Sequence, residues 1–324
     1  MNVFQLRNCP ICGSSSRENF ISSNFALDQS ADELAYFKNL WYGLDKSSHF
    51  LDYYKCLNCH CIYCPKYFTE TSLNELYEFM PPNMELISED LIQKTQSRYA
   101  SFLVKSIGQR LAAKRDKSIS ILELGSDTGI FLIKLISLLH EKYSINPEKI
   151  NVISIEPNVG IFPILQENMA RTRVNFQLFE SFEKYLHTCD LPIDLIAAIH
   201  VLDHILTPQQ FLCEIAKRGN EEFYLYGVVH NVESMLARLL GKSWPPFCLQ
   251  HPQLYSKRTL PRLFSASFAV KELQISQTSN DYPLSIIANF LGLNFLSPLL
   301  QSMYLTIPLG NIQFLCQASY LNEK

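Results

Sequence analysis

Cysteines near the start of the chain have the spacing of a metal site. Six of the ten cysteines precede residue 65, and four of these form two Cys-x-x-Cys pairs. In such a pair, two thiolates point at one ion while nearby backbone N–H groups support the sulfurs. Two pairs supply four sulfurs, the tetrahedral set that Zn²⁺ prefers. The sequence therefore predicts a structural zinc site whose ligands are Cys9, Cys12, Cys56 and Cys59.

Other uses of these cysteines fit the sequence less well. A redox-active pair normally opens a helix within a βαβ unit, and nothing before Cys9 supplies one. Buried structural thiols would not explain two matched pairs. Cys61 and Cys64 could be spare ligands, but packed strand residues are the favoured interpretation. Because 43 residues separate Cys12 from Cys56, the segment between them must fold back, and we expect a helix over residues 31–40.

A glycine turn with an unusual carboxylate follows the apolar run Ile119–Leu124. The turn reads E-L-G-S-D-T-G from Glu123 onward and leads into a helix that is apolar almost all round. A dinucleotide-binding turn would have its middle glycine where this chain has Asp127, and a carboxylate there would repel a diphosphate. The turn instead suits a phosphate-free cofactor with a positive centre, such as S-adenosylmethionine. We expect four of its residues to contact the cofactor: Gly125, Ser126, Asp127 and Gly129.

Two acidic residues end successive predicted strands. Glu123, at the end of the first strand, could attract the ammonium group of the cofactor through water. Glu156 follows the second strand in I-E-P and is placed to accept hydrogen bonds from two ribose hydroxyls, which requires a carboxylate. Either residue alone could be an ordinary polar residue at a strand end. The pair, with the glycine turn, predicts nucleoside binding.

Histidines gather at the same predicted edge, where a methyl acceptor would approach the cofactor. Each one alone is better explained as a structural residue, and His200 could also line the cofactor site. Together they predict at least one general base. A segment rich in proline and aromatic residues, 244–255, is the candidate acceptor pocket or lid. The candidates for catalysis are His200, His204, His230, His251 and Tyr255.

The elements that must position these residues alternate between strand and helix. After one long helix or two expected over residues 88–117, the hydrophobic pattern predicts a mainly parallel, doubly wound, seven-stranded sheet with right-handed crossovers. Its ligands would sit at the carboxyl ends of the strands. We place a small zinc-binding lobe at residues 1–83 and the α/β core at 84–324, with a hinge over 67–83. The predicted strands cover residues 119–124, 152–155, 174–179, 193–199, 223–229, 270–275 and 312–320.

These motifs together resemble the class I S-adenosylmethionine-dependent methyltransferases. The resemblance lies in E-L-G-S-D-T-G, I-E-P and H-V-L-D-H-I-L-T-P-Q-Q-F-L, and in C-P-I-C-G with Y-K-C-L-N-C it extends to the subgroup with an N-terminal zinc ribbon. That subgroup includes sugar C-methyltransferases and other small-molecule methyltransferases. The resemblance implies methyl transfer to a small-molecule acceptor, a sugar or a natural-product intermediate. Asp127 and His60 depart from the pattern, since both positions commonly hold glycine.

Composition excludes several other function classes. The formal net charge of −3 gives no electrostatic reason to bind nucleic acid. Polar residues and Pro298 interrupt the most apolar stretch, 284–300, so we expect a buried helix or a partner-facing segment and no membrane span. The N-terminus lacks the apolar core of a signal peptide, which predicts a cytoplasmic location. The oligomeric state stays open, as does a non-catalytic scaffold that binds partners through the same fold.

Overall fold

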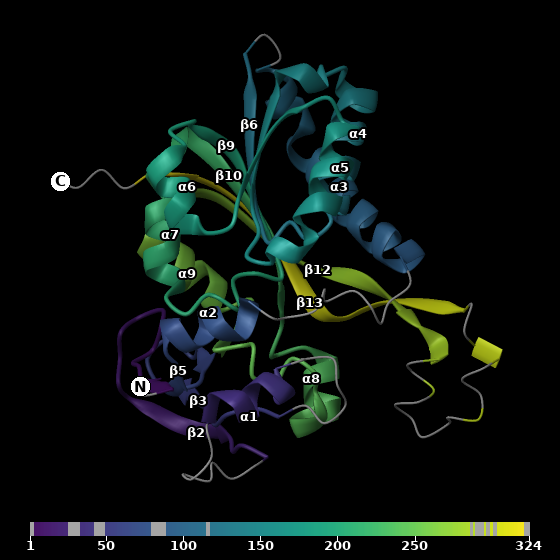
Figure 1. Ribbon diagram of the computed structural model, residues 1–324. Coiled ribbons are helices and arrows are strands. Elements are labelled where there is room, and N and C mark those ends of the chain that lie inside the picture. Colours follow the sequence, from purple (N-terminus) through teal and green to yellow (C-terminus); the bar gives the residue numbers. More distant parts are fainter. Residues whose placement is uncertain are drawn as a thin grey trace.

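The core of the protein is a seven-stranded sheet in the order β8–β7–β6–β9–β10–β13–β12 (Figure 1). The computed structural model describes residues 3–24, 33–41, 49–78, 89–114, 117–285 and 303–320, with residues 288, 295, 299 and 300. β13 runs antiparallel to its two neighbours, and the other pairs within β8–β10 are parallel. The strands are β6 (Ile119–Leu124), β7 (Ile150–Ile155), β8 (Asn175–Phe179), β9 (Ile193–Ile199), β10 (Gly219–His230), β12 (Ala269–Pro283) and β13 (Tyr304–Ser319).

Helices cover both faces of this sheet, as the alternating sequence pattern predicts. One face packs against α3, α4 and α5, and the other against α6, α7 and α9 (Figure 1). The interior strand β6 is buried along its whole length because both of its faces are covered. The doubly wound α/β class is thus confirmed. The helices are α3 (Glu89–Ala112), α4 (Ile130–Tyr143), α5 (Phe162–Ala170), α6 (Phe182–Thr188), α7 (Pro208–Ala216), α8 (Met235–Leu240) and α9 (Thr259–Ser267), with 3₁₀ turns at Pro147–Lys149, Val159–Ile161 and Gly241–Ser243.

The last two strands are longer than the sequence pattern predicts. The expected strand 270–275 lies in β12, and residues 312–319 of the expected strand 312–320 lie in the part of β13 next to β10. Pairing of β12 with β13 continues to Pro283 and Tyr304, although β10 pairs no further than Asn311. The extension forms a two-stranded arm that projects from the sheet (Figure 1). The predicted apolar segment 284–300 lies mostly outside the described residues.

A small lobe built on the N-terminal residues packs below the core in Figure 1. It contains a two-stranded sheet, β1–β5, and a four-stranded sheet in the order β2–β3–β4–β11. The predicted helix over 31–40 appears as α1, and residues 31–32 lie outside the described part. The lobe's elements are β1 (Phe4–Leu6), β2 (Arg17–Ile21), α1 (Glu33–Leu40), β3 (Tyr53–Cys56), β4 (Ile62–Tyr63), β5 (Lys66–Phe68) and α2 (Glu70–Glu78).

The edge strand of the lobe sheet comes from the far end of the sequence. β11 (Gln253–Leu254) pairs with β4, so part of segment 244–255 lies in the lobe. The hydroxyl of Tyr53 donates to the carbonyls of Cys248, at 3.1 Å, and His251, at 2.7 Å. Trp244 and Phe247 are buried in the same hydrophobic cluster as Tyr53. The lobe and the core therefore share one packed interior along this segment.

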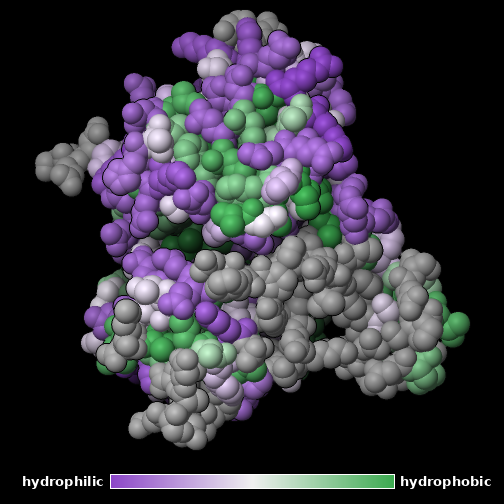
Figure 2. Space-filling view, in the orientation of Figure 1, coloured by the Kyte–Doolittle hydropathy of each residue, from purple (hydrophilic) through white to green (hydrophobic). Residues whose placement is uncertain are grey.

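The boundary region between lobe and core is partly ordered secondary structure. Residues 67–68 and 70–78 of the expected hinge belong to β5 and α2, and residues 79–88 lie outside the described part. Within the helices that the structure describes, none combines the length and the apolar character needed to cross a membrane. Figure 2 shows a mostly hydrophilic surface on the core, with hydrophobic side chains gathered near its middle.

Candidate functional site

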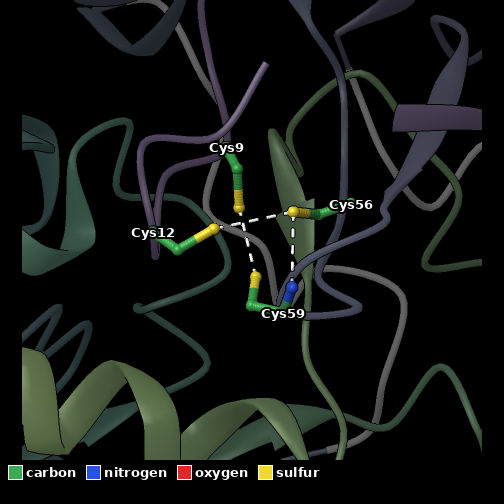
Figure 3. Close-up of side chains that lie close together, drawn as sticks. All are labelled: Cys9, Cys12, Cys56 and Cys59. Atoms are coloured by element: carbon green, nitrogen blue, oxygen red, sulfur yellow. Dashed lines mark hydrogen bonds between the residues drawn. The ribbon is translucent and has the colours of Figure 1, made fainter. Parts of the chain in front are cut away.

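The four cysteines of the predicted metal site lie together in the lobe (Figure 3). The Sγ atoms of Cys9 and Cys59 are 3.3 Å apart, those of Cys12 and Cys56 are 3.6 Å apart, and all four lie within 4.8 Å of one another. Four thiolates around one ion at about 2.3 Å would be separated by about 3.8 Å. Small shifts would therefore bring the sulfurs to the spacing of a tetrahedral metal site. Three of the cysteines are buried and Cys12 is exposed.

The two Cys-x-x-Cys turns have the same backbone geometry. The N–H of Gly13 donates to the carbonyl of Cys9 at 2.9 Å, and the N–H of His60 donates to that of Cys56 at 3.0 Å. Both residues adopt a left-handed conformation, with φ of 69° for Gly13 and 65° for His60. The histidine that replaces the common glycine is thus accommodated in a conformation that glycine adopts with less strain.

Replacing His60 by glycine should therefore stabilise the lobe. We expect His60→Gly to raise the free energy of unfolding by about 0.5–1 kcal/mol, because the strain of a left-handed side-chain residue exceeds the extra chain entropy of glycine. Urea unfolding of the metal-loaded protein measures this change. The mirror variant Gly13→Ala should lower the stability, and a loss of stability in both variants would contradict the argument.

The two other cysteines near the cluster occupy packed positions. Cys61 and Cys64 are buried in two different hydrophobic clusters. Burial raises the pKa of both thiols, so both are neutral at ordinary pH. Among the described residues, the group of potential metal ligands in the lobe contains neither of them. This placement agrees with their interpretation as packing residues.

The glycine turn connects β6 to α4 in a tight, left-handed conformation. Three of its residues have positive φ: 64° at Gly125, 46° at Asp127 and 78° at Gly129. A Cβ on Gly125 would lie 2.9 Å from Cγ2 of Val201, and one on Gly129 would lie 2.7 Å from Cδ1 of Leu165. Both glycines therefore suit this conformation, and a Cβ at either position would also force a neighbouring side chain to shift. Aspartate tolerates the left-handed region better than most residues, which explains how Asp127 fits between them.

The two predicted acids end adjacent parallel strands on either side of this turn. The Oε2 atom of Glu123 is buried and has no hydrogen-bond partner among the described residues. Burial raises the pKa of Glu123 well above its ordinary value, and the nearby Glu156 and Asp127 add to the effect. A buried carboxyl group without a partner can bind a cation or a hydrogen-bond donor.

Glu156 already holds the turn in place. Its Oε2 accepts a hydrogen bond from the backbone N–H of Asp127, and its Oε1 accepts one from that of Asn158, both at 2.9 Å. Burial raises the pKa of Glu156 despite these two bonds. Each carboxylate oxygen has a second lone pair, so Glu156 can still accept hydrogen bonds from a ligand. The backbone of the turn therefore fixes the positions of both carboxylate oxygens, which would form part of the binding site.

All four predicted histidines lie in one group at the ends of β9 and β10. The ring centroids of His200 and His230 are 4.7 Å apart, those of His230 and His251 are 4.9 Å apart, and those of His251 and His204 are 4.6 Å apart. The group borders the glycine turn through the contact between Val201 and Gly125. Burial lowers the pKa of His200 and of His204 to about 3, so both imidazoles are neutral.

Asp203 lies at the centre of this group and was not among the predicted catalytic residues. It is 0% exposed, and its Oδ2 accepts hydrogen bonds from Nδ1 of His230 at 2.6 Å and from the backbone N–H of His230 at 3.1 Å. Burial opposes ionisation of Asp203, but the imidazole of His230 outweighs it and its pKa lies below the ordinary value. The only signal in the sequence is an acidic residue beside His204, just after a strand end.

The other candidates have structural partners. Nδ1 of His251 donates to the carbonyl of Pro246 at 2.7 Å, and Nδ1 of His204 shares a hydrogen bond of 3.0 Å with the Tyr77 hydroxyl. Tyr255 is fully buried, and its hydroxyl donates to the carbonyl of Leu202 at 3.1 Å. Segment 244–255 is accordingly packed into the protein, with most of its side chains buried. It forms a wall of the histidine group and supports it.

Comparison with known proteins gives a family. A family model described as a methyltransferase domain matches residues 95–267, more than half of the chain. No curated protein sequence matches the chain. The match begins inside α3 and ends with α9. It therefore includes the glycine turn, both acids and all four histidines.

A comparison with solved structures finds several methyltransferases. One is a SAM-dependent methyltransferase from Aquifex aeolicus, with 16% identity and a TM-score of 0.44, covering 75% of this chain and 100% of that one. The CurJ carbon methyltransferase has 14% identity and a TM-score of 0.47, with coverage of 78% and 58%. The mycolic acid cyclopropane synthase CmaA1 has 13% identity and a TM-score of 0.40, with coverage of 62% and 78%. By the family model, the chain belongs to the methyltransferase-domain family, as a class I S-adenosylmethionine-dependent methyltransferase.

Proposed function

We propose that this protein transfers the methyl group of S-adenosylmethionine to a small-molecule acceptor, a sugar or a natural-product intermediate. The observation that carries the proposal is the juxtaposition of a buried acidic pair, Glu123 and Glu156, with a buried histidine–aspartate group across the glycine turn. A nucleoside cation bound beside the two carboxyl groups would lie next to an acceptor bound beside the histidines. Methyl transfer then needs alignment of the acceptor with the methyl group and removal of its proton.

The residues around the turn suit this cofactor. The partnerless oxygen of Glu123 would receive the ammonium group, directly or through water, and Glu156 would receive the ribose hydroxyls. Gly125, Ser126, Asp127 and Gly129 would lie along the cofactor, with His200 at its far side. When bound, S-adenosylmethionine supplies an electrophilic methyl group on a sulfonium centre. The protein's part is to hold it and to exclude water.

The enclosed position of the histidine group favours a small acceptor over a macromolecule. Asp203 is fully buried, and the side chain of His230 keeps only 21% of its surface exposed. A net charge of −3 also argues against a nucleic-acid acceptor. We infer that the acceptor's reacting atom lies beside the group formed by His200, Asp203 and His230 when it loses its proton. His204, His251 and Tyr255 then keep that group in place.

The lobe's cysteines suit Zn²⁺ as a structural ion. Four sulfurs leave no coordination position open, so the ion would hold the lobe together and take no part in methyl transfer. The lobe in turn holds segment 244–255, which carries His251 and Trp244 to the histidine group. We propose the division at residues 1–83 and 84–324 as one between two units that share an interior along this segment. Reduced thiols at this site also suit a reducing compartment such as the cytoplasm.

Calorimetric titration tests the proposal. S-adenosylmethionine and its demethylated product S-adenosylhomocysteine should both bind the purified protein, and a scaffold without cofactor affinity would bind neither. Incubation with S-adenosylmethionine labelled in the methyl group and an extract of small metabolites should then give a labelled product that mass spectrometry identifies. Absence of cofactor binding would contradict the proposal.

The affinity for S-adenosylmethionine should rise with pH. In the free protein, burial raises the pKa of Glu123 and Glu156, so each is partly protonated at a pH where a free carboxyl would be ionised. A bound cation favours the carboxylate and lowers these pKa values, so binding releases protons. The affinity should therefore increase up to about tenfold per pH unit for each proton released. It should level off above the pKa values that these two carboxyl groups have in the free protein.

Titrations at several pH values, in two buffers with different heats of ionisation, measure the released protons. Glu123→Gln should reduce their number, whereas Glu167→Gln, on the exposed surface of α5, should not. Proton uptake on binding would contradict this assignment.

A further inference from the structure

Two polar atoms in the histidine group lack the partners that their burial requires. Asp203 is fully buried, and only its Oδ2 is hydrogen-bonded, to His230. Its Oδ1, and Nδ1 of His200, are buried without a hydrogen-bond partner in the part of the chain that the structure describes. Buried polar atoms nearly always have a hydrogen-bond partner. Two buried atoms without a partner in the same cluster of side chains therefore indicate that a ligand binds between them.

The spacing of the three side chains is that of metal ligands. One ring nitrogen of His200, one of His230 and a carboxylate oxygen of Asp203 all lie within 4.8 Å of one another. An ion that binds such donors at about 2.0–2.2 Å holds neighbouring ligands about 3.0 Å apart in octahedral geometry and about 3.4 Å apart in tetrahedral geometry. The 2.6 Å contact between Nδ1 of His230 and Oδ2 of Asp203 needs only a small opening to reach these values.

We propose that His200, Asp203 and His230 form a site for a divalent transition-metal ion, separate from the cysteine cluster. Two imidazoles and one carboxylate are borderline ligands that suit Fe²⁺, Co²⁺, Ni²⁺ or Zn²⁺, in contrast to the four soft thiolates of the lobe. Three protein ligands leave coordination positions open, as in catalytic metal sites. This inference rests on the proposed function and deepens it, because the open positions lie where the acceptor would bind.

The surrounding residues hold these ligands in place. His200 directly follows β9 with a φ of 54°, and its backbone N–H donates to the carbonyl of Val228 at 2.8 Å. The side-chain amide of Asn311 lies 3.5 Å from Nε2 of His200, which leaves Nδ1 for an ion. His251 uses its Nδ1 for the carbonyl of Pro246, so it supports the site without supplying that nitrogen.

The site indicates a class of acceptor. An ion with two open positions suits a molecule with two neighbouring oxygen atoms, such as a vicinal diol or a hydroxy acid, and lowers the pKa of its hydroxyl. That hydroxyl would release its proton to solvent. Its oxygen would form a bond to the methyl carbon as the carbon–sulfur bond breaks, which yields a methyl ether and a neutral thioether.

Cobalt titration of the chelator-treated, full-length protein tests the site without knowledge of the acceptor. Thiolate ligands give Co²⁺ an intense charge-transfer absorption in the near ultraviolet, whereas nitrogen and oxygen ligands give only weak visible bands. We expect two Co²⁺ per chain, one of each kind. The second ion should also quench Trp244, whose ring centroid is 6.3 Å from that of His230.

Variants of the ligands separate this site from the lobe. Asp203→Asn and His200→Gln should each weaken the weakly absorbing site at least about a hundredfold and leave the thiolate band unchanged. The matched control is His187→Gln, an exposed histidine on α6 that should retain both ions. Circular dichroism checks folding, and His200→Gln keeps the test valid if the buried Asp203→Asn variant does not fold.

The possible outcomes distinguish this inference from the proposed function. A wild-type protein that binds Co²⁺ only at thiolates, or ligand variants that keep both ions, would overturn the metal site. If such a protein still binds S-adenosylmethionine, the proposed function stands and the histidine–aspartate group acts without a metal. Failure of the wild-type protein to bind S-adenosylmethionine would contradict the proposed function, whatever the cobalt result.

Discussion

Replacing Cys56 with alanine is expected to unfold the N-terminal lobe, whereas replacing Cys64 with alanine is not. Both side chains are buried in the lobe, at 0% and 1% exposure, so the two substitutions remove the same atom from equally buried positions. Only Cys56 belongs to the cluster of four sulfurs. Binding of a structural zinc ion contributes about 10–16 kcal/mol in small zinc domains, far more than one buried thiol. Loss of one ligand should therefore cost most of the lobe's stability.

The effect should reach the core through segment 244–255. Tyr53 donates to two carbonyls of that segment, and Trp244 and Phe247 share the lobe's hydrophobic cluster. Unfolding of the lobe would expose Trp244 and disturb His230 and His251 beside it. We expect Cys56→Ala to lose its zinc, to show a red-shifted tryptophan emission and to exchange the amide hydrogens of residues 244–255 rapidly.

Metal analysis, fluorescence and hydrogen exchange measure these three changes. Cys64→Ala should keep its zinc, its emission maximum and its protection. Equal behaviour of the two variants would show that the cysteine cluster is not a metal site and that the lobe folds by hydrophobic packing alone.

The features that the sequence predicted correctly are those encoded by neighbouring residues. The spacing of Cys9 and Cys12, repeated in Cys56 and Cys59, is sufficient to indicate that four sulfurs meet. The alternation of apolar strands and helices defines the sheet because each element buries its own pattern. Glu123 and Glu156 end adjacent strands, and parallel strands place their carboxyl ends at one edge. Their proximity follows from topology, without any knowledge of side-chain packing.

The features that were missed depend on contacts between distant parts of the chain. β11 is only two residues long, and some 190 residues separate it from its partner strand β4. No local periodicity in the sequence therefore indicates this strand. Proline and aromatic residues in 244–255 predicted a pocket or lid, yet Trp244 and Phe247 serve as packing between lobe and core. Asp203 was missed because its position among four imidazole rings results from the fold. In the sequence it is only an acidic residue just after a strand end.

Replacing Glu156 with glutamine should weaken binding of S-adenosylmethionine by about 10- to 100-fold. A hydrogen bond to a charged acceptor contributes about 1.5–3 kcal/mol, and the uncharged amide cannot accept from two directions as the carboxylate does. The measurement is a calorimetric titration, supported by the shift in unfolding temperature at a fixed cofactor concentration. The control is Glu167→Gln on α5, whose side chain is exposed and paired with Arg171. It should leave the affinity unchanged.

The same variant separates two roles that one carboxylate can have. Glu156 accepts backbone hydrogen bonds from Asp127 and Asn158, so Glu156→Gln should also destabilise the free protein, because an amide nitrogen would face one of these N–H groups. A purely structural role would lower the unfolding temperature with and without cofactor by the same amount. A binding role lowers the cofactor-induced increase as well. The difference between these shifts, and not the loss of stability itself, identifies Glu156 as a cofactor ligand, and an unchanged cofactor-induced increase would remove it from the binding site.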